Sequence, residues 1–442
     1  MNTNIPTLEP AYDFNVDVHS IQLYCGRVEI CIDGSIYVGD GEVRLDFLPK
    51  ASVNFYGHFH NVPFEDRLKE ISFFTINNIK VECLKLSGDL NLTSDEFNVK
   101  CCPKLEPINC IGNDSTQIKW ILFHLFNFVD LIGNRKTVEQ SKGKDCTIRH
   151  IDLFSDDWKV ELKSLISTNE NIKLLREEGG YRLTHIGCIT RTNDVQFTGK
   201  MAKEFLYALR FVLSFAKGGW CEPICAIGFD NAGNRVWELW SSPKEPWVVP
   251  VTWFDPYNSY QLVELFPNFM KRWADDSWQE ALREVVYWYL NANNPSRGVD
   301  AGIILTQAAL ERLSYEYVVK DKKLLSVDGF KNIWASDKLR LLFSSLRIPL
   351  DIPVEAHNLQ CFALSKQIKW LDAPHALTEI RNSLVHPEHK HRGRYDTAYY
   401  EAWNLGLWYL EMSILAICNY TSTYGNRLKQ RWVGEIEDVP WK

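Results

Sequence analysis

The N-terminal quarter of the chain alternates between apolar and polar residues, a pattern typical of β-strands that bury one face. The clearest run of apolar residues at every second position is Val53, Phe55, Gly57 and Phe59. Turn-type dipeptides, among them Asp33-Gly34 and Asp40-Gly41, separate such runs and predict hairpins. Residues 1–110 are therefore predicted to form a β-rich domain, a sandwich-like sheet of short strands.

Residues 111–240 mix helical and strand patterns, and they form either a unit of their own or one unit with residues 1–110. The predicted elements are a helix at Ile118–Ile132, an amphipathic helix at Met201–Ala216 with Gly218-Gly219 as its stop, and a hairpin at Ile224–Trp240 around Asp230–Asn234. This stretch is predicted to be mixed α/β.

A proline-rich linker, residues 241–256, precedes a C-terminal part of different character. Its four prolines disfavour both helix interiors and central strands. Beyond it, apolar residues in 257–442 recur almost throughout with helical spacing. The helices predicted there are Tyr260–Trp273, Ser277–Leu290, Val299–Lys320, Asp337–Leu346, Asn358–Trp370, Ala373–His386 and Arg394–Tyr424. The predicted fold class is α+β, a β-rich mixed N-terminal region followed by an all-α helical-bundle domain.

Composition and charge narrow the class of protein. With 45% hydrophobic residues among 442, the chain can bury a large core, which excludes disordered and fibrous classes. The N-terminus lacks the features of a signal peptide, no apolar stretch is long enough to span a bilayer, and the 12 cysteines lack zinc-module spacing. We therefore expect a reduced, cytoplasmic protein without a membrane partner. The net charge of −7 lies entirely before Pro256, which argues against a long nucleic-acid track there.

Common cofactor and nucleophile signatures are absent from the sequence. His58 and His60 would lie on one face of a strand and could bind a metal ion, but no acidic or cysteine partner stands at a recognisable spacing. Surface or packed histidines are the favoured interpretation. No cofactor and no metal site are therefore predicted.

The most informative segment is the predicted helix Ala373–His386. Asp372 can cap its start, and Pro387 disfavours helical geometry at His386. Asn382 and His386 share a face, and Arg381 lies one position round, so an arginine, an amide and an imidazole gather at the end of the helix. Such a group can cleave RNA without metal, because histidine moves protons near neutral pH and a guanidinium neutralises charge on the phosphate.

The spacing of Arg381 and His386 alone is weak evidence, because it is expected by chance about once in two such chains. A structural histidine beside a solvated arginine is the alternative. The context strengthens the functional interpretation: Asn follows Arg, Pro follows His, an apolar helix precedes the motif, and a long helix is predicted after it.

Arg381-Asn382-x-x-x-His386 resembles the R-x4-6-H motif of HEPN domains, and the resemblance covers about residues 256–442. Members are all-helical, and many are metal-independent ribonucleases that work as dimers. More narrowly, the chain resembles the ApeA-type HEPN proteins of bacterial antiphage defence. The residues that carry this narrower likeness are Gly302–Ser314, Asn419-Tyr420, Tyr424 to Arg427, and Val439 to Trp441. A toxin branch of the family carries Tyr where this chain has Glu388, which makes nucleotide-transfer chemistry less favoured.

The resemblance implies roles for individual residues. Arg381 would neutralise the scissile phosphate, His386 would move protons, and Asn382 would orient the phosphate or the imidazole. Each centre would be assembled from both protomers of a homodimer. The expected RNA contacts, with a solvated turn as the alternative, are Lys390, Arg392 and Arg394. Glu311 and Arg312 are expected either to support the motif or, more often for such a pair, to form a solvated helix face.

The predicted function is a metal-independent endoribonuclease that leaves 2′,3′-cyclic phosphate ends, with tRNA as candidate substrate, in an abortive-infection defence. The N-terminal region would sense a phage-derived trigger or restrain the nuclease, for example by covering the cationic turn after His386. The alternative is a HEPN-like domain without catalysis that serves as a dimerisation or ligand-binding scaffold in a defence or regulatory complex. A third option, a metal-dependent hydrolase built on His58 and His60, predicts loss of activity with a chelator.

Overall fold

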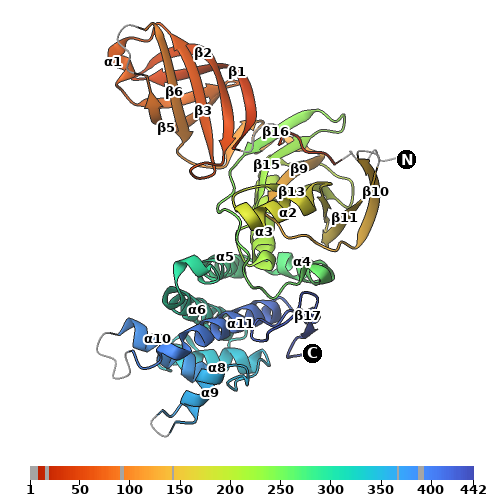
Figure 1. Cartoon of the computed structure of the whole chain (residues 1–442), viewed down its shortest axis with the longest axis vertical. Coiled ribbons are helices and arrows are strands. Elements are labelled where there is room, and N and C mark those ends of the chain that lie inside the picture. Colours follow the sequence, from red (N-terminus) through yellow and green to blue (C-terminus); the bar gives the residue numbers. More distant parts are fainter. Residues whose placement is uncertain (1–7, 15–18, 90–93, 142–143, 366–367, 387–392) are drawn as a thin grey trace.

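The computed structural model describes residues 8–14, 19–89, 94–141, 144–365, 368–386 and 393–442. From one end of the molecule to the other, they form a six-stranded barrel, an eight-stranded sheet with helices, and a helical bundle (Figure 1). The fold is mixed α+β with a β-rich N-terminal region and a helical C-terminal region, as the hydrophobic pattern predicts.

The N-terminal barrel is closed and antiparallel, with strand order β1-β2-β3-β6-β5-β4 and β4 pairing back to β1. Its elements are β1 (Ser20–Ile32), β2 (Ser35–Asp46), β3 (Ser52–His60), α1 (Phe64–Arg67), β4 (Ile71–Ile76), β5 (Ile79–Gly88) and β6 (Glu96–Pro103). The alternation in β3 is confirmed, since Val53, Phe55, Gly57 and Phe59 are all buried. The prediction of a sandwich-like sheet is wrong. The barrel closes through the long-range pairing of β1 with β4, which the alternation of apolar and polar residues cannot predict.

Of the two dipeptides predicted as turns, one forms a turn and the other lies inside a strand. Asp33-Gly34 forms the β1–β2 turn, with positive φ angles of 49° and 86°, so this prediction is confirmed. Asp40-Gly41 lies inside β2, so the second prediction is wrong. A Cβ on Gly41 would lie 2.5 Å from the carbonyl oxygen of Tyr56, which indicates that this glycine permits close strand approach rather than a turn.

The middle sheet is antiparallel and has the order β10-β11-β12-β13-β9-β15-β16-β7. The strands of this sheet, with the short pair β8 and β14, are β7 (Ile108–Ile111), β8 (Gln117–Ile118), β9 (Trp120–Phe126), β10 (Arg135–Ser141), β11 (Lys144–Ser155), β12 (Trp158–Ser164), β13 (Leu183–Arg191), β14 (Phe197–Thr198), β15 (Pro223–Phe229) and β16 (Arg235–Trp240). The hairpin predicted at Ile224–Trp240 is confirmed as β15 and β16. Helices α2 (Thr168–Glu178) and α3 (Gly199–Lys217) accompany the sheet, and α3 ends at the predicted Gly218.

The helix predicted at Ile118–Ile132 is wrong, because the segment forms the central strand β9. Ile121 and Phe123 join the core shared with the helices, whereas Leu122 and Phe126 join the core that continues into the barrel. Both faces of β9 are therefore buried, and a strand of this kind reads as a continuous apolar run that periodicity cannot distinguish from a buried helix.

The C-terminal region is almost wholly helical. Its elements are α4 (Tyr260–Trp273), α5 (Asp276–Ala292), α6 (Val299–Ser314), a π-helical turn (Tyr315–Asp321), α7 (Val327–Lys331), α8 (Ala335–Ser345), α9 (His357–Ala363), α10 (Ala373–Val385), α11 (Tyr399–Ile417) and the short strands β17 (Thr423–Tyr424) and β18 (Glu437–Asp438). The predicted helix Asn358–Trp370 is shortened to α9, and Arg394–Tyr424 to α11. The last residues of that predicted helix turn back and pair as strand β17 with β18, which ends α11 early.

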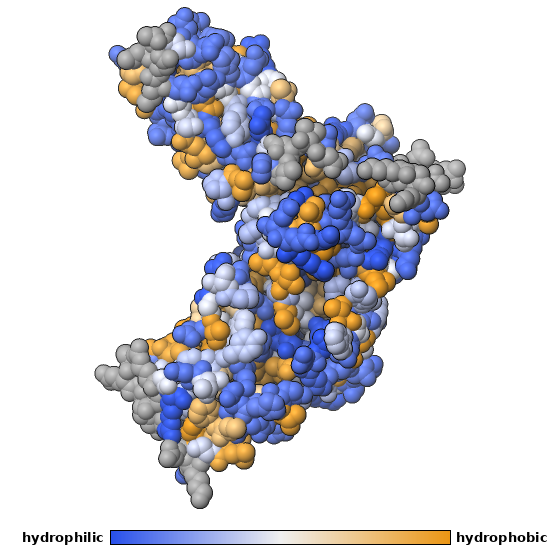
Figure 2. All heavy atoms as spheres, in the orientation of Figure 1, coloured by the Kyte–Doolittle hydropathy of each residue, from blue (hydrophilic) through white to orange (hydrophobic). Residues whose placement is uncertain are grey.

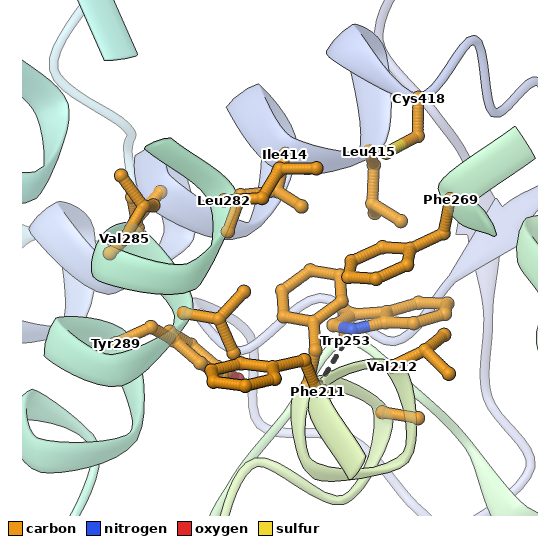
Figure 3. Close-up of a cluster of buried hydrophobic side chains, with 14 of the residues drawn as sticks. Phe211, Val212, Trp253, Phe269, Leu282, Val285, Tyr289, Ile414, Leu415 and Cys418 are labelled. Atoms are coloured by element: carbon orange, nitrogen blue, oxygen red, sulfur yellow. Dashed lines mark hydrogen bonds between the residues drawn. The ribbon is translucent and has the colours of Figure 1, made fainter. Parts of the chain in front are cut away.

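The proline-rich linker carries no helix or strand over residues 241–255, but it is packed into the core. Trp253 is fully buried and donates a hydrogen bond from Nε1 to the carbonyl oxygen of Phe215, 3.2 Å away. Figure 3 shows Trp253 among Val212 of α3, Phe269 of α4 and the side chains of α11. One hydrophobic core therefore joins the middle sheet to the helical region. None of the helices in the described ranges is both long and apolar enough to cross a membrane.

Candidate functional site

Helix α10 carries the motif and is defined at both ends by its sequence. Asp372 caps its start by accepting a hydrogen bond from the backbone N–H of His375 at 3.0 Å. His386 is the residue at the C-terminal cap, with extended backbone angles, and its N–H donates to the carbonyl oxygen of Asn382 at 3.0 Å. The predicted start and end of this helix are thus confirmed.

The first turn of α10 is fixed to the bundle by an ion pair. Arg340 of α8 holds both carboxylate oxygens of Asp372, at 2.6 and 3.0 Å. Ile380 on the inner face of α10 is fully buried. Since α10 contacts α6, α8 and α11, the motif stands on a rigid element, as precise chemistry requires.

The motif residues lie at the outer end of α10, away from the barrel (Figure 1). Arg381 donates from one terminal nitrogen to Oδ1 of Asn382 at 3.1 Å. The Nε atom of Arg381 is buried and has no hydrogen-bond partner within the described ranges. His386 is exposed. The structure therefore joins Arg381 to Asn382 directly and leaves His386 open on the following turn.

Of the three residues predicted to contact RNA, Lys390 and Arg392 lie outside the described residues. Arg394 is exposed and lies close enough to Tyr395 to act on its ionisation. Burial and then Glu379 of α10 raise the pKa of Tyr395 to about 12, and Arg394 opposes them. Tyr395 thus lies near Glu379 of α10, and Arg394 precedes it on the segment that leads into α11.

Glu311 and Arg312 lie on α6, a helix that does pack against α10. Glu311 accepts a hydrogen bond from Gln307 at 3.0 Å. Arg312 is held by Glu284 of α5 at 2.8 Å and by the buried Glu316 at 2.6 Å. Both side chains therefore have partners on or beside their own helix, and no bond from either to Arg381, Asn382 or His386 is found in the described part.

The arrangement at α10 can bind and act on a phosphodiester. The side chain of Arg381 is partly exposed, and a guanidinium is a donor suited to anionic oxygens. An exposed imidazole one turn away can exchange protons with a bound nucleotide. Both functions are available from this chain's own side chains.

Sequence reasoning missed a second feature, a pocket of 870 Å³ between the barrel and helix α3. In Figure 2 the outline of the molecule is hollowed between the barrel and the helical region. Basic residues that line the pocket are Lys50, Lys100, Lys104, Lys203, Arg210 and Lys244. The ammonium of Lys244 and the guanidinium of Arg210 lie 3.9 and 4.6 Å from the ring centroid of Trp220. These residues come from segments distant in sequence, and no local pattern could have grouped them.

Glu222 also lines this pocket and is nearly buried, with 12% of its side chain exposed. Burial raises its pKa to about 7, and Arg210 at 3.4 Å opposes that shift. The Nε of Arg210 faces Oε2 of Glu222 in this ion pair, whereas Oε1 of Glu222 lacks a hydrogen-bond partner among the described residues. The pocket therefore combines a carboxyl of raised pKa with Tyr207 and basic side chains.

The family models and the curated relative that match this chain all concern the protein YopA. Residues 113–249 match the family model described as the YopA central domain, and residues 275–438 match the YopA C-terminal domain. An SPbeta prophage-derived uncharacterized protein, YopA of Bacillus subtilis (strain 168), is 29% identical over 444 residues, which span 98% of this chain and 96% of the relative. No solved structure matches the chain. The chain is thus similar to a prophage protein, YopA, along nearly its whole length.

Proposed function

We propose that the protein is a metal-independent endoribonuclease of the HEPN type, with its active centre at the outer end of α10. The observation that carries the proposal is the gathering at one helix end of a partly exposed Arg381, bonded to Asn382, and an exposed His386. A guanidinium beside an imidazole can neutralise the charge of a phosphate while the imidazole moves protons.

The proposed reaction is an internal transesterification of RNA. The 2′-oxygen forms a bond to phosphorus, the bond from phosphorus to the 5′-oxygen breaks, and a 2′,3′-cyclic phosphate remains. His386 takes the proton from the 2′-hydroxyl or returns one to the leaving 5′-oxygen. Arg381, oriented by its hydrogen bond to Asn382, neutralises the charge on the phosphate oxygens.

The reaction needs an acid and a base, which two copies of His386 supply if two chains meet at α10. Apolar side chains on neighbouring elements are available for such contact. Leu364, Leu371 and Tyr400 are 82%, 75% and 63% exposed. They lie at the end of α9, just before α10 and at the start of α11, where contact between two copies of the bundle would bury them. A homodimer through the HEPN-like helical bundle is therefore part of the proposal.

The proposed setting is antiphage defence by abortive infection, with tRNA as substrate. The Bacillus subtilis relative is prophage-derived, and a prophage that arrests its host's translation denies the host to a competing phage. The pocket between the barrel and α3 supports a sensing role for the N-terminal region, since its basic and aromatic lining suits a phage-derived anionic trigger. In this proposal the trigger acts at a site distinct from α10.

The test is cleavage of total bacterial tRNA by the full chain in EDTA, followed by mapping of the ends. We expect the wild type to produce 2′,3′-cyclic phosphate ends, and Arg381→Ala and His386→Ala to lose at least about 100-fold in rate. Arg347→Ala and His357→Ala are matched controls, because both residues are exposed and lie in the helical region outside the motif.

Three outcomes contradict the proposal. Equal cleavage by wild type and His386→Ala would remove the active centre from α10. Loss of wild-type cleavage in EDTA would favour a metal-dependent hydrolase. Absence of cleavage with and without phage infection, together with loss of phenotype on disrupting the dimer but not on His386→Ala, would favour the non-catalytic scaffold.

A further inference from the structure

The outer face of the barrel gathers three side chains that bind transition metals. His58 and His60 point outward from β3, and Glu96 of β6 is the register partner of His60. The ligand atoms of these three residues all lie within 4.8 Å of one another. The two imidazole rings are 4.7 Å apart and nearly perpendicular. The acidic partner that the sequence spacing did not identify is thus supplied by an adjacent strand.

A hydrogen-bonded chain fixes the proton on His58. Asn98, opposite His58 on β6, donates from its amide nitrogen to Asp89 at 2.7 Å. A carboxylate only accepts, so the oxygen of the Asn98 amide faces His58, whose Nδ1 lies 2.7 Å away. Nδ1 of His58 must therefore carry the hydrogen, which leaves a lone pair on Nε2 directed away from Asn98. A histidine oriented in this way by a second residue is the arrangement found at metal sites.

We propose that His58, His60 and Glu96 bind a zinc ion, with a fourth position left to water or to a ligand of the protein. Two nitrogens and one carboxylate oxygen are a common protein ligand set for an open tetrahedral zinc site. Ligand bonds of about 2.1 Å place ligand atoms roughly 3.4 Å apart. The observed separations therefore need to contract by little more than 1 Å, which rotation of the two exposed side chains, His60 and Glu96, provides.

A pocket adjoins the proposed zinc site and can admit a ligand to the fourth coordination position. A pocket of 640 Å³ on the same face is lined by His58, Asn98, Tyr56 and Lys100. The ammonium of Lys100 lies 4.9 Å from the centroid of the Tyr56 ring. Lys100 is paired with Asp46 at 3.1 Å, so the pocket gives a small polar ligand, or water, access to the open position of the metal. This zinc site is independent of α10, and the proposed ribonuclease reaction does not use it.

The experiment is calorimetric titration of the EDTA-treated full chain with Zn²⁺, and with Mg²⁺ as a metal that prefers oxygen ligands. We expect the wild type to bind one Zn²⁺ more than His60→Ala or Glu96→Gln, and Mg²⁺ to bind to neither form. His357→Ala, which removes an exposed histidine of α9, should bind as the wild type does. Comparing each variant with the wild type subtracts any Zn²⁺ bound by exposed cysteines.

Asn98 is a positioning residue, and its variants separate orientation from folding. Asn98→Ala should weaken Zn²⁺ binding by about 10–100-fold. The double variant Asn98→Asp/Asp89→Asn exchanges the two side chains, keeps an acceptor for Nδ1–H and a donor opposite it, and should restore most of the affinity. Thermal unfolding in EDTA checks that each variant is folded. Equal Zn²⁺ stoichiometry and affinity in wild type and the folded His60→Ala and Glu96→Gln variants would overturn the proposal, as would a wild type that binds Mg²⁺ equally well.

Discussion

The buried ion pair between Glu411 and Arg427 is expected to be the most sensitive point of the helical region. Arg427 donates to both carboxylate oxygens of Glu411, at 2.6 and 3.0 Å, and the exposed fractions of the two side chains are 1% and 0%. The same guanidinium donates to Val251 of the linker and Asn293, and Tyr289 of α5 donates to Glu411 at 2.6 Å. Four segments therefore meet at one pair of charges.

The substitution Arg427→Met removes one charge and leaves the other buried. Glu411 would keep only the hydrogen bond from Tyr289, the carbonyl of Val251 would keep only the one from Asn293, and Oδ1 of Asn293 would lose the donor Arg427. Removing one partner of a buried pair costs about 3–5 kcal/mol in the free energy of unfolding. For a region of this size, each kcal/mol corresponds to about 2–4 °C in the unfolding midpoint. We expect Arg427→Met to lower that midpoint by about 10 °C.

The assay is thermal and urea-induced unfolding of the full chain, with Arg347→Ala as an exposed control that should change stability by less than about 0.5 kcal/mol. The double variant Glu411→Gln/Arg427→Met removes both charges and should recover at least half of the loss. A cost below about 1 kcal/mol for Arg427→Met would refute the reasoning. So would a double variant no more stable than the single one.

Two further predictions concern the β-rich region. Burial lowers the pKa of His185 from the usual value near 6.5 to about 3. Between these two pH values the unfolded chain binds a proton that the folded protein does not, so the protein loses stability as the pH falls from 6.5 towards 3. The free energy of unfolding in urea is measured at pH 7 and at pH 5. The decrease between the two should be about 2 kcal/mol smaller in His185→Leu than in the wild type. An equal decrease in both proteins would contradict the lowered pKa of His185. Gly41→Ala should lower stability by about 1–3 kcal/mol, because its Cβ would lie 2.5 Å from a backbone oxygen. Gly329→Ala, whose Cβ would meet nothing closer than a serine hydroxyl at 3.2 Å, should cost much less, and equal costs would refute the steric argument.

The sequence correctly predicted those features that depend on interactions between neighbouring residues. The Asp33-Gly34 turn, the cap at Asp372 and the stop at Gly218 each depend on a few neighbouring residues. The wrong predictions concern elements whose structure depends on contacts between distant parts of the chain. The central strand β9 is apolar on both faces because cores lie on both sides, and barrel closure depends on a pairing between β1 and β4.

The candidate sites divide in the same way. Arg381, Asn382 and His386 could be grouped from sequence because they share one helix end. Glu96 and Asn98 could not be grouped with His58 and His60, because the register of β3 against β6 joins residues almost forty positions apart. The pocket beside α3 likewise draws on the barrel, the sheet and the linker, which only the folded chain brings together.

The shared core decides how the ribonuclease proposal must be tested. Trp253 and Phe215 pack into the same core as Tyr289 and Phe269 of the helical region. Cutting the chain at Pro256 would remove Trp253, the linker carbonyl bound by Arg427 and the α3 side of this core. An inactive fragment would then report unfolding and not the loss of a sensor. The same continuity gives a ligand in the pocket beside α3 a packed route to α5 and from there to α6 and α10, so sensing should be probed by point substitutions that line the pocket in the full chain.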